Sequence, residues 1–319
     1  MRRWILLALK IGISAGLLYW ASRSVDLGAV AGHFARLDAV WVALALAALA
    51  LQIAVAAQRW SWIATKLGAV LPARRAIRYS LVATFFNQAL PSTVGGDAMR
   101  VWLLGRSDRQ WKRAVYSVFV DRAAGVGFLA VVVAACLPWS LERIAAPEGR
   151  VAVMVIGLGG VAGLVVGLAL GFTTPGARLA AWRLARVLFE VAGASRAALL
   201  DRRRGPGIAI LSVFVHILTV VAAWCLARAI TISPNALNML ILIPPVMLIS
   251  MIPVSIGGWG IREGTMVVAF GYAGIEPSQA LAVSVLLGIS TLAVGAAGGI
   301  IWLAERQPAR AATGVQPHG

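Results

Sequence analysis

The segment Pro91-Ser92-Thr93-Val94-Gly95-Gly96-Asp97-Ala98-Met99-Arg100 has a counterpart about half a chain length later, Pro253-Val254-Ser255-Ile256-Gly257-Gly258-Trp259-Gly260-Ile261-Arg262. A proline, a hydroxyl residue, a Gly-Gly pair and an arginine keep the same spacing in both copies. Each copy interrupts an apolar region. Hydrophobic segments broken by Gly and Pro at matching positions of two halves are typical of the substrate sites of membrane transporters. The pair therefore predicts a membrane protein built from two repeats.

The composition also favours a membrane protein. Of the 319 residues, 60% are hydrophobic and only 13% are charged, a balance that is not typical of soluble domains. The net charge of +17 comes from basic residues that cluster between long apolar runs, which is the pattern of cytoplasmic loops. We therefore expect no nucleic-acid partner. No group of His, Cys, Asp or Glu residues has the spacing of metal ligands, so we predict no metal or cofactor. We interpret His216 as a packed polar residue.

Apolar runs of roughly 17–25 residues can cross the hydrocarbon core of a membrane. Six runs qualify: 4–20, 40–57, 114–137, 151–172, 207–229 and 280–303. Two further apolar regions, 79–104 and 236–274, are broken and contain the two motif copies. We interpret them as re-entrant hairpins, because the stretch before Pro91 is too short for a comfortable span. The alternative is a pair of short full crossings.

The distribution of charge predicts the orientation. Basic residues predominate in 58–78, 98–113 and 173–206, whereas 21–39 and 138–150 carry balanced charges. Because Lys and Arg are retained on the cytoplasmic side, the first three segments are predicted to be cytoplasmic and the other two external. The first broken region is then flanked by cytoplasmic segments on both sides.

Each half therefore contains three spans and one broken hairpin, and an odd number of crossings inverts the second half relative to the first. We predict an all-α polytopic membrane protein with two inverted repeats and both termini in the cytoplasm. The single membrane domain covers 1–310, with repeat one at about 1–138 and repeat two at about 150–305. The segment 306–319 is predicted to be a flexible cytoplasmic tail.

The broken motifs also suggest a binding site. A helix that breaks inside a membrane leaves backbone groups that only protein or a water-filled cavity can satisfy. A helix that starts near Gly96 would direct its free N–H groups toward an anion, and the guanidinium of Arg100 or Arg262 suits a phosphate. The predicted lipid-headgroup site comprises Asn87, Pro91, Ser92, Thr93, Gly95, Gly96, Asp97, Arg100, Asp121, Arg122, Pro253, Ser255, Gly257, Gly258, Arg262 and Glu263. The alternative is that the motifs are structural hinges.

Several of these residues have two interpretations. Asp121 and Arg122 form either a polar site beside the first hairpin or an interfacial ion pair. Asp97 and Glu263 either neutralise the arginines of their motifs or contact a cationic headgroup. Asn87 is expected to hydrogen-bond the backbone that the break frees.

Two basic stretches, 59–78 and 178–204, mix Trp and aliphatic residues with Lys and Arg. Basic amphipathic helices of this kind lie on membrane surfaces that carry anionic lipids. We predict that both stretches form helices on the cytoplasmic surface.

The run Phe85-Phe86-Asn87 before the first motif copy, the pair Asp121-Arg122 and the second copy followed by Glu263 together resemble the lysylphosphatidylglycerol synthase transmembrane-region family, also described as flippase-like. The similarity covers roughly 5–305. It implies an inner-membrane protein that moves a lipid between leaflets. In fused members, a cytosolic domain attaches lysine to phosphatidylglycerol. No such domain follows the last apolar run here, so we expect a stand-alone member without aminoacylation activity.

The leading hypothesis is therefore a lipid translocase that moves a phospholipid or another anionic lipid across the bacterial inner membrane. One alternative is a membrane enzyme that acts on a lipid-linked polyprenyl sugar or phosphate. Another is a non-catalytic partner of a separate lipid-modifying synthase. The expected partners are membrane lipids, with a separately encoded lipid-modifying enzyme or a second copy of the chain as further candidates. No residue is assigned a catalytic role.

Overall fold

The computed structural model of the protein describes residues 27–35, 37–89, 95–144, 146–176, 181–252 and 258–306, together with Gly12 and Gly16. Within these residues the chain forms twelve helices and no strand. Five helices are long and apolar enough to cross a membrane: α3 (Ala39–Lys66), α6 (Trp111–Ala135), α8 (Pro147–Leu170), α11 (Gly205–Ala229) and α14 (Pro277–Arg306). They confirm five of the six predicted spans, and the sixth, 4–20, lies almost wholly outside the described residues.

Shorter helices connect these five. They are α2 (Leu27–Phe34), α4 (Ala73–Ala89), α5 (Gly95–Asp108), α7 (Leu137–Arg143), α10 (Arg183–Leu199), α12 (Ala236–Ser250) and α13 (Ile261–Gly271). Each of the two broken regions forms a pair of helices, α4 with α5 and α12 with α13, and the members of each pair pack against each other. The predicted breaks at the Pro and Gly-Gly motifs are therefore confirmed.

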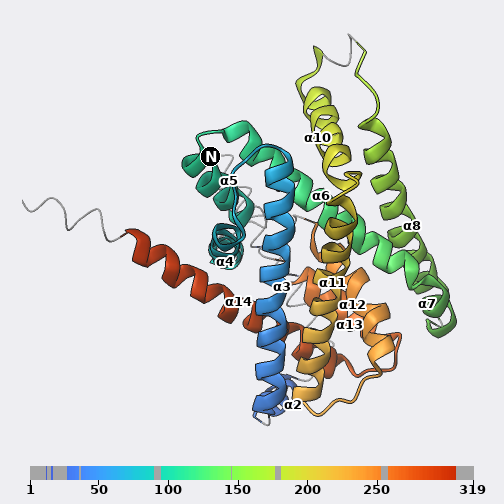
Figure 1. Cartoon of the computed structure of the whole chain (residues 1–319). Helices are drawn as coiled ribbons and strands as arrows, with labels where there is room; N and C mark the ends of the chain where they lie inside the picture. Colours follow the sequence, from blue (N-terminus) through green and yellow to red (C-terminus); the bar gives the residue numbers. More distant parts are fainter. Residues whose placement is uncertain are drawn as a thin grey trace, which may run out of the picture.

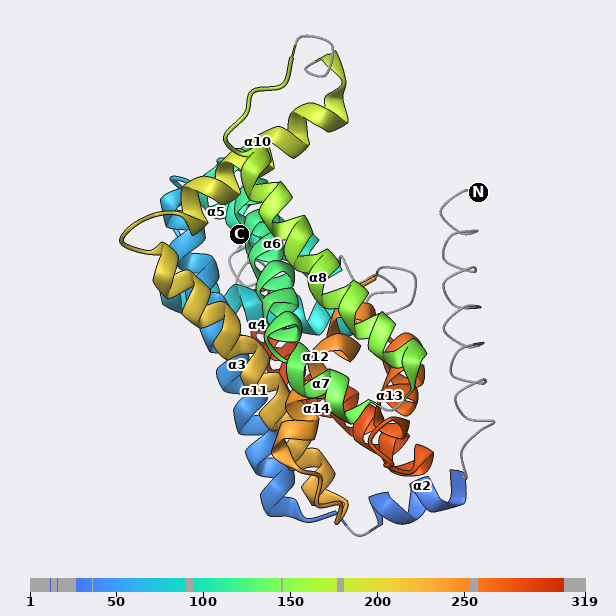
Figure 2. The same cartoon turned by 90° about the vertical axis from the view of Figure 1, so that its right-hand side faces the viewer.

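The most extensive contact between two of the described helices is that of α3 with α11, which run side by side along the molecule (Figures 1 and 2). The apolar core lies where α11 meets α12, α13 and α14. Its largest members are fully buried: Leu226, Ile230, Met239, Ile243, Met266 and Phe270. Burial of side chains of this size contributes about 1.5–3 kcal/mol each in a soluble protein. In a membrane the contribution comes from close packing, because lipid tails are as apolar as these side chains.

Glycines permit close packing between α4 and α14. A Cβ atom added to Gly298 would lie 2.1 Å from the carbonyl oxygen of Leu81, and one added to Gly295 would lie 3.2 Å from the backbone nitrogen of Phe85. The two backbones therefore approach each other more closely than any side chain would permit. This is the use of small residues that is common between membrane helices.

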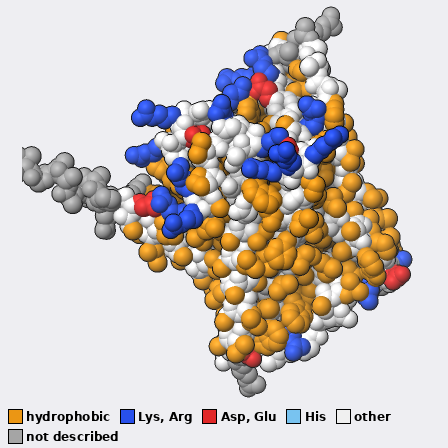
Figure 3. Space-filling model, viewed as in Figure 1, with side chains coloured by type: hydrophobic (Ala, Val, Ile, Leu, Met, Phe, Trp, Pro, Cys, Tyr) orange, Lys and Arg blue, Asp and Glu red, His pale blue; other side chains and the backbone are white. Residues whose placement is uncertain are grey.

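The basic segments lie toward one end of the molecule, where α5 and α10 are found, and hydrophobic side chains cover the middle of the face shown in Figure 3 (Figures 1 and 3). At this end Lys66 forms an ion pair with Asp201, which joins the end of α3 to the turn before α11. Helices α2 and α7, from the two charge-balanced segments, lie toward the other end (Figure 1). The grouping of segments by charge is thus the one that the sequence predicts.

The prediction of a surface helix at 59–78 is wrong. Its first part is the last two turns of α3, and its last part belongs to α4. Arg59, Trp60 and Ile63 are only 5%, 0% and 0% exposed. The reason is that no Gly or Pro occurs in α3, so the helix continues through its first charged residue. The second predicted stretch, 178–204, does contain a helix, α10.

Candidate functional site

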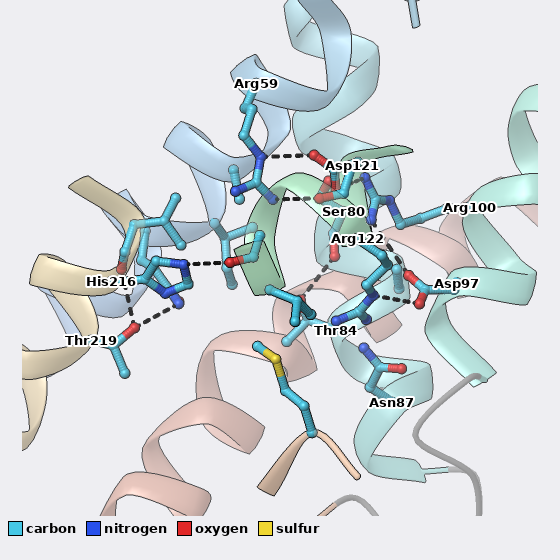
Figure 4. A pocket seen from close by; sticks show the side chains of 18 of the residues that line it. Arg59, Ser80, Thr84, Asn87, Asp97, Arg100, Asp121, Arg122, His216 and Thr219 are labelled. Atoms are coloured by element: carbon cyan, nitrogen blue, oxygen red, sulfur yellow. Dashed lines mark hydrogen bonds and ion pairs between the residues drawn. The ribbon is translucent and has the colours of Figure 1, made fainter. Parts of the chain in front are cut away.

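Five charged side chains from three helices meet in the interior, and we call them the arginine–aspartate cluster (Figure 4). They are Arg59 of α3, Asp97 and Arg100 of α5, and Asp121 and Arg122 of α6. Asp121 accepts from Arg59 Nε at 2.8 Å and from Arg100 Nη2 at 2.7 Å. Asp97 accepts from Arg122 Nε at 2.5 Å, and its other oxygen lies 3.4 Å from Arg100 Nη1. The cluster holds three positive and two negative charges, so one positive charge is in excess.

The aromatic ring and hydroxyl groups around the cluster fix the two inner arginines. The guanidinium carbon of Arg100 lies 4.1 Å from the centre of the Trp60 ring, a distance suited to a cation–π contact. Trp60 is itself held by a 3.1 Å hydrogen bond from its indole N–H to Ser117. Arg59 donates to Ser212 of α11 at 3.3 Å. One donor is left over: Nε of Arg100 is buried without a hydrogen-bond partner among the described residues.

Exposure distinguishes Arg122 from the rest of the cluster. Its side chain is 42% exposed, whereas those of Arg59, Arg100, Asp97 and Asp121 are 4 to 16% exposed. The two terminal nitrogens of Arg122 have no hydrogen-bond partner in the part of the chain that the structure describes. Arg122 is therefore the cation of the cluster that is most available to a ligand.

Two adjoining cavities lie beside the cluster. The first, of about 270 Å³, is lined by all five members of the cluster and by residues of α4, α11 and α12. The second, of about 450 Å³, extends from Asp97 and Arg122 to Arg262 of the second motif. Gln52, Val126 and Met247 are among the residues that line both cavities. Together the cavities connect the two motif copies, and their size is typical of small-ligand sites.

The first motif brings α4 and α5 into contact. Helix α5 begins at Gly95, and the N–H of Gly96 donates to Asn87 Oδ1 of α4 at 2.8 Å. A Cβ atom at Gly96 would lie 2.2 Å from the carbonyl oxygen of Ala83, so only glycine fits there. The predicted hydrogen bond between Asn87 and the freed backbone is confirmed, with the Asn87 side chain as the acceptor.

The second motif neutralises its own arginine. Arg262 Nη2 donates to Glu263 Oε1 at 2.6 Å, and both side chains are buried. Ser284 of α14 donates to the same oxygen at 3.0 Å, while Glu263 Oε2 accepts from the N–H of Gly260 at 2.6 Å. Glu263 thus both pairs with the arginine and caps the start of α13.

The sequence profile described as Lysylphosphatidylglycerol synthase TM region matches residues 7–299 of the chain. The chain belongs to this family. The match includes every residue that lines the two cavities, and with the five membrane-length helices it identifies a multi-pass membrane protein. None of the curated proteins compared with the chain matches it.

In this member of the lysylphosphatidylglycerol synthase TM region family the two motif copies differ in local geometry, although their spacing is identical. Helix α5 begins at the first glycine of its Gly-Gly pair, whereas α13 begins at Ile261, after its pair. The cause is backbone conformation: Gly258 and Gly260 have φ angles of 81° and 87°, which are incompatible with a right-handed helix. Arg100 therefore lies in the second turn of its helix and Arg262 in the first.

The structure brings together most of the predicted site residues that it describes. Asn87, Gly96, Asp97, Arg100, Asp121 and Arg122 adjoin the first cavity, and Gly258 and Arg262 line the second, with Glu263 behind Arg262. Gly95 begins α5. The remaining predicted residues lie outside the described parts of the chain: Pro91, Ser92, Thr93, Pro253, Ser255 and Gly257.

Several residues of the site were not predicted from the sequence of this family member, among them Arg59, Gln52 and Thr219. Arg59 and Gln52 lie on α3, and Gln52 donates to Thr219 of α11 at 3.0 Å. The sequence does contain a signal: Gln52 and Arg59 are seven residues apart, which places them on one face of a helix.

His216 also lines the first cavity, and its Nε2 lies 2.9 Å from the carbonyl oxygen of Gly125. Its interpretation as a packed polar residue is confirmed. Nowhere in the described residues do three or more His, Cys, Asp or Glu side chains form a group that could hold a metal ion.

Proposed function

We propose that the protein is a lipid translocase that moves an anionic lipid between the leaflets of the bacterial inner membrane. The observation that carries the proposal is the excess positive charge beside a cavity in a bundle of membrane-length helices. Arg122 provides this charge, and apolar residues such as Val126 and Met251 line the same cavity. A charged group at membrane depth is expensive and is usually functional.

In this proposal the lipid phosphate binds Arg122, and the acyl chains stay in the bilayer. The phosphate would compete with Asp97 for the guanidinium, so that binding and release change only one ion pair. The inner arginines remain held by Asp121 and keep the cavity positive. The second cavity would lead the headgroup toward Arg262.

The proposed arrangement in the membrane is the one predicted from the sequence repeat and the distribution of charge. The pairs α4–α5 and α12–α13 are taken as re-entrant hairpins of two inverted repeats. The end that carries the basic segments faces the cytoplasm, as do both termini. Alternating access would then consist of movement of one repeat against the other.

Replacing Arg122 with glutamine should lower lipid translocation by at least about tenfold, because a charge-assisted hydrogen bond to the phosphate is lost. The measurement is the flip rate of fluorescent phosphatidylglycerol in proteoliposomes, read by quenching with a membrane-impermeant reductant. The matched control is Arg202→Gln, at an exposed arginine of the turn before α11. Equal rates for wild-type protein and Arg122→Gln would contradict the proposed role of Arg122.

One observation favours a second candidate, an enzyme that acts on a lipid-linked substrate. Asp97 and Asp121, which are distant in sequence, line the same cavity, and acid–base catalysis often uses two carboxylates. Arginine nitrogens lie within 3.4 Å of all four of their oxygens, however, so neither carboxylate is available as a base in this arrangement. Loss of product formation with intact lipid binding in Asp97→Asn would favour this candidate over the translocase.

A further inference from the structure

The carboxylates beside the proposed lipid site are already fully engaged. Both oxygens of Asp121 accept from arginines at 2.7 and 2.8 Å, and both oxygens of Asp97 face arginines at 2.5 and 3.4 Å. The oxygens of Glu263, behind Arg262, are taken by Arg262, Ser284 and the N–H of Gly260. An ammonium group in the cavities would therefore find no free carboxylate among the residues that the structure describes.

Aromatic rings provide the other common way to bind an ammonium group. The described residues that line the two cavities include no Phe, Tyr or Trp. The two short stretches that carry the motif prolines, 90–94 and 253–257, contain neither an acidic nor an aromatic residue in their sequences. The described walls thus provide neither of the two features that recognise a cationic headgroup.

Apart from the charged side chains, the cavities are lined mostly by apolar residues, and neutral polar groups lie among them. Gln52 and Asn87 present side-chain amides, and hydroxyl groups come from several helices: Ser80, Thr84, Thr219, Ser250 and Thr291. The hydroxyls of Thr84, Thr219, Ser250 and Thr291 donate to carbonyl oxygens of their own helices, which leaves their oxygens to accept from the hydroxyl groups of a ligand. The site therefore combines one excess positive charge with a wall for uncharged polar groups.

We infer that the headgroup bound here is a phosphodiester with one negative charge whose other polar groups are hydroxyls, as in a glycerol or sugar headgroup. A single phosphodiester would balance the excess charge of the cluster. An ethanolamine headgroup would add one ammonium, which restores the excess charge, and a lysyl headgroup would add two; both are unfavourable in a poorly hydrated site. This inference rests on the proposed function and narrows its substrate class.

The first test compares three fluorescent lipids in proteoliposomes of the wild-type protein: phosphatidylglycerol, phosphatidylethanolamine and lysyl-phosphatidylglycerol. Phosphatidylglycerol should flip at least about tenfold faster than the other two. An ammonium group without a counter-charge in this site lacks at least one charge-assisted hydrogen bond, and a loss of that size corresponds to about tenfold in rate. Equal rates, or a faster lysyl lipid, would overturn the inference but leave a translocase. If no lipid flips, the proposed function fails and the inference fails with it.

A further arm of this test separates a lipid headgroup from a free anion. Uptake of labelled inorganic phosphate is measured in the same vesicles. We expect none above empty liposomes. Phosphate uptake without lipid flipping would assign the cavity to the free anion and overturn the inference.

The second test places a free carboxylate in the site by Gln52→Glu. The Thr219 hydroxyl, which donates to the Val215 carbonyl oxygen in the wild-type protein, can rotate to donate to the new carboxylate, so the contact between α3 and α11 is retained. The rate ratio of phosphatidylglycerol to lysyl-phosphatidylglycerol should fall by about tenfold relative to wild type. Gln110→Glu makes the same change at an exposed position before α6 and should leave the ratio unchanged. An unchanged ratio in folded Gln52→Glu would overturn the inference.

Discussion

Replacing Asp121 with asparagine should destabilise the protein more than any other single change in the cluster. The carboxylate of Asp121 holds Arg59 and Arg100 at 2.8 and 2.7 Å, and all three side chains are buried. Asparagine would present one acceptor and an NH₂ group that faces the arginines. Loss of one partner of a buried ion pair costs about 3–5 kcal/mol, because the remaining charge has neither water nor a counter-ion. We expect a large fall in the melting temperature of the detergent-solubilised protein, with loss of the monodisperse fraction.

Asp201→Asn is the matched control for this prediction. It removes the same charge from an ion pair with Lys66, the last residue of α3, and Asp201 itself lies outside the membrane-length helices. The hydrogen bond from Lys66 lowers the pKa of Asp201 to about 2, so this carboxylate is fully ionised at neutral pH. Exposed ion pairs contribute little to stability, and the control should melt close to wild type. Similar melting temperatures for the two variants would show that Asp121 contributes no more to stability than Asp201 does.

A double variant tests the reason for the loss. Arg59→Met removes one of the two cations and fills a similar volume with an apolar chain. In the background of Asp121→Asn it should restore part of the lost stability, because one unpaired charge is eliminated. Arg59→Met alone should be destabilising, since Asp121 would then keep only Arg100. Additive effects of the two changes would contradict the assigned ion pair.

Replacing Gly298 with alanine should separate α14 from α4. The added Cβ would lie 2.1 Å from the carbonyl oxygen and 2.2 Å from the carbonyl carbon of Leu81. Both are backbone atoms, so no side chain can rotate away and one helix has to move. Overpacking of this kind costs about 1–3 kcal/mol, and more where the backbone is rigid. The same melting assay measures the loss.

Gly163→Ala of α8 provides the control, because a Cβ atom there meets no other atom within 4 Å. Alanine favours a helix by about 0.5–1 kcal/mol over glycine, so this variant should be as stable as wild type or slightly more stable. A similar loss in both variants would indicate that the contact between α4 and α14 is loose.

Features that depend on local sequence could be predicted, and features that depend on tertiary contacts could not. Run length was sufficient to identify α6, α8, α11 and α14 as membrane-length helices. The breaks at the motifs were also predictable, because Pro and Gly disfavour helix whatever surrounds them. The hydrogen bond between Gln52 and Thr219 joins residues 167 positions apart and has no local signal.

Arg59 shows how a sound rule gave a wrong result. Charged residues usually mark the end of a membrane span, so α3 was expected to end before Arg59. The carboxylate of Asp121 changes that balance by supplying a counter-charge from another helix. A position of Asp121 beside the first broken region was one of the two interpretations of this residue, but its partner on α3 was not predicted. An arginine followed by a further helical turn of apolar residues is the pattern that would have indicated a buried charge.

The two motif arginines also differ in when their partners are synthesised. Glu263 directly follows Arg262, so α13 can leave the ribosome and enter the membrane as a locally neutral unit. Arg59 emerges long before Asp121, whereas Arg100 emerges just after Asp97, which lies 3.4 Å from it, but before its closer partner Asp121. The cost of the unpaired charge of Arg59 falls only when α6 arrives. We therefore expect α3 to α6 to be released into the lipid together, whereas the second half can be inserted one segment at a time.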